Sequence, residues 1–93
     1  MQERLNLLEI IERDLLSDDP LAHAYAIRAC CIKGISSPVV IDELKKLKHT
    51  NEISMLQNIA NSATAALDIL GVEKYTGSNS NIIEIIETCY YSK

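Results

Sequence analysis

The soft metal ligands of this chain are two histidines and three cysteines: His23, His49, Cys30, Cys31 and Cys89. Zinc sites usually take their ligands from close pairs such as C-x-x-C or H-E-x-x-H, and neither pattern occurs. The adjacent cysteines would point about 100° apart on a helix, so they cannot easily share one ion. A cysteine nucleophile would need an activating histidine and an oxyanion hole, and no motif in the sequence indicates an oxyanion hole. We therefore expect core thiols, no enzymatic activity and no metal or cofactor.

A small basic cluster made of Lys45, Lys46, Lys48 and His49 is the other charged feature. It falls at the end of a predicted helix, where positive charge compensates the helix dipole. It could also contact phosphate, which keeps weak nucleic-acid binding through Lys45–His49 open as an alternative. The formal net charge of −4 disfavours nucleic acid and anionic membranes as partners, because binding would release few counterions.

An uncharged polar face is predicted on the segment from about 52 to 70. It consists of Gln57, Asn58, Asn61 and Ser62, where an exposed helix more often carries charge. This face is either ordinary solvated surface or a contact surface, since low charge suits the core of an interface. Tyr91 joins it as a candidate anchor for a partner, because tyrosine is enriched at binding hot spots. For Tyr90, packing against the helix is the expectation.

The composition fits one aliphatic domain. The chain has 93 residues, 47% of them hydrophobic and 24% charged, with neither Trp nor Phe. Three cysteines, an odd number, do not suggest a disulfide framework, so we expect a reducing, cytoplasmic compartment. No basic, apolar leader resembling a signal peptide is evident at the start, and no run is long enough to span a bilayer.

Start and stop signals predict helices throughout. One amphipathic helix covers about 3–17. The next covers 20–33, with Asp18 or Asp19 as N-cap, Pro20 at the first position and Gly34 after the end. Ser37 and Pro38 begin the third in the same way, and it extends to about Lys48.

The fourth helix is predicted to run from about Glu52 to Leu70, with Leu56, Ala60, Ala63 and Leu67 on its apolar stripe and Gly71 at its end. A linker at 73–81 precedes a last helix that starts at Ile82, with Asn81 and Glu84 resembling a capping box. Its isoleucines leave a buried strand open as the competing prediction. No strand is expected in the first seventy residues.

The second and fourth helices are related by an internal repeat. A shift of thirty-seven places superposes Ala26 on Ala63, Cys30 on Leu67 and Gly34 on Gly71. The first and third helices align best at thirty-three places. The difference is about one helical turn, so we expect an extra turn at the start of the fourth helix. A repeated helix–turn–helix unit is typical of a helical solenoid.

At this point the sequence resembles the HEAT-repeat family, including its short bacterial HEAT-like form. The second helix of that family typically reads Asp-x-x-Val-Arg-x-x-Ala-x-x-Ala-Leu. The matching residues are Asp19, Ala22, His23, Ala26, Ala29 and Cys30 in one unit and Ile59, Ala60, Ala63, Ala66 and Leu67 in the other. His23 and Ala60 replace the usual Arg, which leaves a generic helical bundle or an armadillo-like variant open. The resemblance implies a scaffold that binds other macromolecules.

Together these observations predict an all-α fold: a short HEAT-like α-α superhelix of two helical hairpins over 1–72, the linker 73–81, and a capping or swapped helix over 82–93. The expected function is a non-enzymatic protein–protein interaction module with an unknown protein partner. The alternatives are a self-assembling homodimer and the weak nucleic-acid binder described above.

Overall fold

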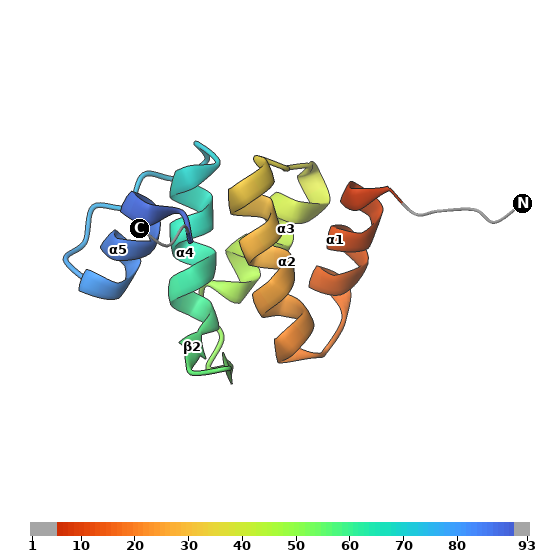
Figure 1. The fold of residues 1–93 in the computed structure, drawn as a ribbon, viewed down its shortest axis with the longest axis horizontal. Coiled ribbons are helices and arrows are strands. Elements are labelled where there is room, and N and C mark those ends of the chain that lie inside the picture. Colours follow the sequence, from red (N-terminus) through yellow and green to blue (C-terminus); the bar gives the residue numbers. More distant parts are fainter. Residues whose placement is uncertain (1–5, 91–93) are drawn as a thin grey trace, which may run out of the picture.

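The computed structural model of the chain describes residues 6–90. They form five helices and one two-stranded antiparallel hairpin, in the order α1 (Leu7–Leu16), α2 (Pro20–Lys33), α3 (Pro38–Leu47), β1 (Ile53–Ser54), β2 (Gln57–Asn58), α4 (Ile59–Ile69) and α5 (Ser80–Thr88). The helices follow one another along the molecule from α1 to α5, with α2 and α4 roughly side by side (Figure 1). The predicted all-α class is confirmed, since each strand has only two residues.

The predicted start of α2 and α3 is confirmed by their caps. Asp19 accepts a hydrogen bond of 3.0 Å from the backbone N–H of Leu21, and Ser37 Oγ accepts one of 3.1 Å from Val40. Each cap satisfies a backbone donor that has no partner inside the helix. Gly34 ends α2 with a φ of 64°, a left-handed conformation that glycine adopts without steric cost.

The repeat is visible in how α2 and α4 end. Gly71 has a φ of 78°, like the glycine that closes α2. The N–H of Ile35 donates to the carbonyl of Cys30 at 3.1 Å, and that of Val72 donates to Leu67 at 2.8 Å. These are the same 6→1 bonds, thirty-seven places apart, that close a helix in a Schellman motif. The duplicated pattern in the sequence therefore gives duplicated backbone geometry.

The segment before α4 departs from the sequence prediction. We expected a helix from about Glu52 and no strand before residue 70, and both expectations are wrong. The side chain of Asn58 accepts a 2.9 Å hydrogen bond from the N–H of Asn61, so α4 begins only at Ile59. The residues that lengthen the second repeat form the hairpin instead of an extra helical turn. Leu56, predicted on the buried stripe, is 100% exposed.

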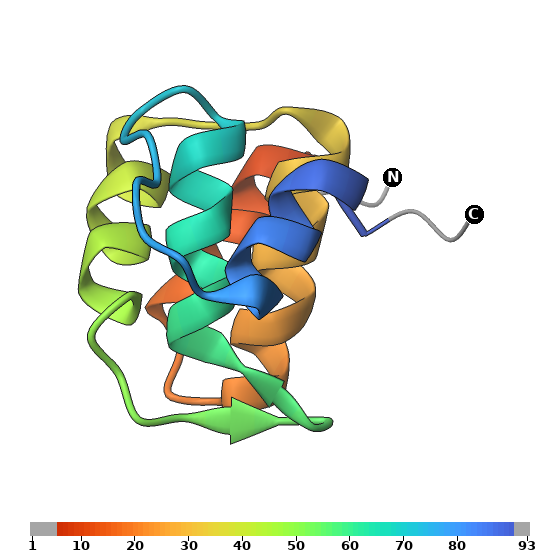
Figure 2. The same ribbon diagram turned by 90° about the vertical axis from the view of Figure 1, so that its left-hand side faces the viewer.

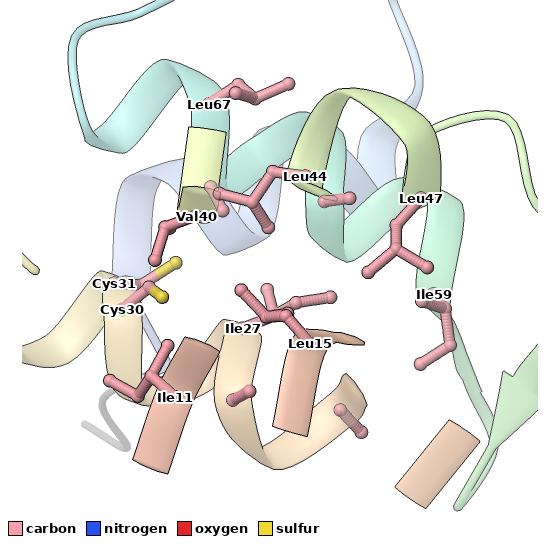
Figure 3. Packing of buried hydrophobic residues seen from close by; sticks show 14 residues of the cluster. Ile11, Leu15, Ile27, Cys30, Cys31, Val40, Leu44, Leu47, Ile59 and Leu67 are labelled. Atoms are coloured by element: carbon pink, nitrogen blue, oxygen red, sulfur yellow. The ribbon is translucent and has the colours of Figure 1, made fainter. Parts of the chain in front are cut away.

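The core lies between the first four helices and is aliphatic, as predicted. Figure 3 shows its larger side chains meeting between the helices. Its fully buried members include Ile11 from α1, Ile27 from α2, Leu44 from α3 and Leu67 from α4. On α4, Ala63, Ala65 and Ala66 have no exposed surface, which permits close approach of the packed helices.

The last helix, α5, packs against α4 and crosses it (Figure 2). It begins earlier than predicted, because the side chain of Asn79, not Asn81, caps it by accepting from the N–H groups of Asn81 and Ile82 at 2.9 and 3.2 Å. It ends at Thr88 rather than near Tyr91, which lies outside the described residues. The alternative of a strand here is wrong. In the described part of the chain, no helix is long and apolar enough to cross a membrane.

Candidate interaction surface

The hairpin exposes three large apolar side chains, Ile53, Met55 and Leu56, which we call the hairpin tip. Their exposed fractions are 67%, 58% and 100%. Single exposed apolar residues are normal on a protein surface, but a continuous group on a projecting element indicates a binding surface. The hairpin lies at the N-terminal end of α4 (Figure 2).

The turn of the hairpin is conformationally unfavourable for its residues. Ser54 pairs with Gln57, so Met55 and Leu56 form a two-residue loop. Their φ angles are 53° and 63°. Positive φ at both positions is what a type I′ turn requires, and Asn-Gly is the usual pair there. A left-handed conformation costs a residue with a Cβ roughly 1–2 kcal/mol, so this turn stores strain beneath an apolar tip.

A groove of about 410 Å³ adjoins the tip between α4 and α5, and we call it the docking groove. None of its lining side chains carries a charge: they are Leu56, Gln57, Asn58, Asn61, Ser62, Asn81, Ile85 and Tyr90. Leu56 belongs to both the tip and the groove, so the two form one continuous surface. Amide side chains can donate and accept hydrogen bonds, which suits recognition of backbone amides.

Four of the five predicted surface residues line this groove. Gln57 is half-buried and Asn58 is exposed. Asn61 Nδ2 donates to Asn81 Oδ1 at 3.2 Å and so bridges α4 to α5. Ser62 differs from the expectation of an exposed position, because it faces α5 and is only 2% exposed. The fifth residue, Tyr91, lies outside the described residues.

Tyr90 packs against the core, as predicted, and closes one side of the groove. Its hydroxyl is buried and has no hydrogen-bond partner within residues 6–90. Burial raises the pKa of Tyr90 to about 12, with the Ser62 hydroxyl acting in the opposite direction. The Arg28 guanidinium lies 5.5 Å from the ring centroid, a cation–π contact between α2 and the second residue after α5.

The cysteines are in the environments expected of core thiols. Cys30 and Cys31 are buried, and burial raises the pKa of each thiol to about 12. Both therefore stay protonated at neutral pH and are poor nucleophiles. Cys89 is half-buried, and its Sγ donates to the carbonyl of Cys31 at 3.3 Å. Among residues 6–90, no group of three or more His, Cys, Asp and Glu side chains could hold a metal ion.

The basic cluster at the end of α3 is partly engaged in ion pairs. Lys46 Nζ lies 3.0 Å from Glu43 Oε2, and Lys48 Nζ lies 2.7 Å from Glu73 Oε1. The hydrogen bond from Lys48 lowers the pKa of the Glu73 carboxyl. These pairs leave less free positive charge for phosphate than the sequence alone suggests.

Sequence reasoning missed the residues that give this surface its shape. Met55 and Leu56 look like ordinary helix formers, and neither Asn81 nor Ile85 carries a sign of facing α4. The detectable signal was Asn58, a good N-cap residue three places before Asn61. The chain matches no protein-family model, no curated protein and no solved structure.

Proposed function

We propose that this protein is a small, non-enzymatic protein–protein interaction module in which a HEAT-like helical scaffold presents the hairpin tip and docking groove to a protein partner. The observation that carries the proposal is the fully exposed Leu56 on a strained turn beside an uncharged groove. Strained backbone at an exposed position is a pointer to function, because the rest of the fold must compensate for its cost. The absence of charge on the groove lining favours a partner segment that is itself uncharged. A cytoplasmic location fits the three free thiols.

The test compares capture of host proteins by three forms of the chain. Met55→Asn combined with Leu56→Gly removes two of the three apolar side chains of the hairpin tip but leaves a favourable turn. Leu16→Gln is the matched control, because Leu16 is 60% exposed on α1 and belongs to neither the hairpin tip nor the docking groove. Quantitative mass spectrometry should find proteins that the wild type and Leu16→Gln retain and the double variant loses. Identical sets of captured proteins for all three forms would contradict the proposal.

Self-assembly is the second candidate. Leu7, Leu21 and Tyr25 are 41%, 41% and 56% exposed on α1 and α2, and they belong to neither the hairpin tip nor the docking groove. A shallow apolar groove of about 250 Å³ lies beside them, lined in part by Ala29 and Ile32. Light scattering across a range of concentrations distinguishes the candidates. A stable dimer that Tyr25→Arg dissociates and the hairpin variant preserves favours self-assembly through this face.

A further inference from the structure

His23 is a buried histidine with both ring nitrogens engaged. The residue is 4% exposed, on the first turn of α2. Its Nδ1 lies 2.7 Å from Glu52 Oε1, and its Nε2 lies 2.6 Å from the carbonyl oxygen of Ser17. Ser17 belongs to the turn between α1 and α2, and Glu52 directly precedes β1. One imidazole therefore connects α2, this turn and the base of the hairpin.

The two partners determine how many protons the ring must carry. A carbonyl oxygen and an ionised carboxylate only accept hydrogen bonds, so both ring nitrogens must donate. A neutral imidazole has one donor, and its other nitrogen would turn a lone pair toward an oxygen less than 3 Å away. With Glu52 ionised, this geometry is therefore satisfied by an imidazolium paired with the Glu52 carboxylate.

The charged groups around His23 also favour the protonated ring. Burial lowers the pKa of His23, but the hydrogen bonds to Glu52 and Ser17 and the negative charges of Glu52 and Asp19 outweigh burial, so that the pKa lies above its ordinary value of 6.5. The charged groups that act on the ring are thus both acidic: Glu52 from the hairpin base and Asp19 at the start of α2.

The hairpin depends on this contact because its own side chains bury little. The residues of the tip are more than half exposed. The carbonyl of Glu52 also accepts the N–H of Ile59 at 3.1 Å, so the residue bound to His23 closes the base of the hairpin. We propose that a proton on His23 holds the hairpin in place, and that its loss frees the hairpin from α2.

The sign of the pH dependence follows from linkage. A histidine with a raised pKa in the folded protein contributes stability that is fully present below about pH 6.5 and is lost as pH rises through the folded pKa. Binding through the hairpin tip should therefore weaken on the alkaline side. This consequence for binding rests on the proposed function, whereas the proton-dependent hold on the hairpin does not.

The key variant is Glu52→Gln. A glutamine amide can donate to a neutral Nδ1 while Nε2–H still donates to the Ser17 carbonyl, so the contact no longer needs the extra proton. His49→Gln is the matched control, because His49 is an exposed histidine outside this contact. NMR spectra of the full chain recorded from pH 5 to pH 9 would follow the His23 ring and the amides of Met55 and Leu56.

In the wild type and in His49→Gln, the His23 ring should titrate above pH 6.5, and the Met55 and Leu56 amides should shift with the same midpoint. In Glu52→Gln the ring midpoint should fall and the amides should lose that titration. A wild-type ring that titrates below pH 6.5, or hairpin amides that ignore its midpoint, would overturn the proposal. If the amides follow the ring but capture of partners is equal at pH 6 and pH 9, the hold on the hairpin stands and its role in the proposed function fails.

Discussion

Replacing Met55 with Asn and Leu56 with Gly should stabilise this protein. Each native residue has a positive φ, which costs roughly 1–2 kcal/mol for a side chain with a Cβ. Glycine at position 56 removes this conformational cost, but it raises the entropy of the unfolded chain and so costs roughly 0.5–1 kcal/mol. Asn at position 55 removes only part of the conformational cost there. Leu56 is fully exposed, so its removal loses no burial. We expect a net gain of about 1 kcal/mol in the free energy of unfolding.

Thermal unfolding followed by circular dichroism would measure the gain. A change of 1 kcal/mol shifts Tm by about 4–8 °C in a domain of this size. Leu56→Ala is the matched control, because it removes the same exposed side chain but keeps the Cβ that makes the turn unfavourable. We expect Tm to rise for the double variant and to stay within about 2 °C for Leu56→Ala.

The sign of the change in Tm also distinguishes the hairpin from the helix that the sequence predicts for these residues. If residues 52–58 were the first turns of a helix, Gly alone would cost about 1 kcal/mol relative to a good helix former, and Asn would add to the loss. A Tm that falls in the double variant would therefore refute the hairpin, and equal Tm values for the double variant and Leu56→Ala would refute the strain.

Three further predictions test the scaffold. Ala63→Arg should leave no cooperative thermal transition, because Ala63 has no exposed surface and an unpaired charge would be buried between helices. Ser37→Ala should lower the free energy of unfolding by about 1–2 kcal/mol in urea titrations, since Ser37 Oγ caps α3 and also donates to Glu12 Oε2 at 2.6 Å; Glu12→Gln, which keeps the cap, should cost less. Gly34→Ala and Gly71→Ala should each cost about 1 kcal/mol by the same measurement, because both have positive φ and an added Cβ would meet nothing within 4 Å. Clearly unequal losses at the two glycines would argue against equivalent helix ends.

The scaffold could be predicted from sequence because its determinants are local. The caps at Asp19 and Ser37 each act on a backbone N–H two or three residues further on. Gly34 and Gly71 each end the helix that precedes them. Such short-range interactions can be inferred from a single sequence. The repeat strengthens the inference because the same signals occur twice.

The hairpin could not be predicted, because its determinants are distant or contrary to local preference. Met55 and Leu56 favour helix, and the apolar spacing from Leu56 to Ala63 continues the helical period of α4. The contact that holds the hairpin base joins residues 23 and 52, whose proximity depends on how the two repeats pack. The same limit applies to the docking groove, since its walls come from α4 and from α5, whose start was misplaced.

The location of the mismatch favours a functional origin over a tolerated insertion. A solvated loop added between α3 and α4 could be built from polar residues and glycine at little cost, because loop length itself is cheap. This segment instead combines a fully exposed Leu56, two residues in an unfavourable conformation and a contact of Glu52 with the buried His23 ring at its base. Local rules hold across the four core helices and fail at this hairpin, where the failure coincides with an apolar tip and an uncharged groove. Within residues 6–90, the other non-glycine residues with positive φ are Cys89 and Tyr90 after α5, and Tyr90 also lines the groove. Local violations that gather around one surface are the pattern expected when strain is retained for binding.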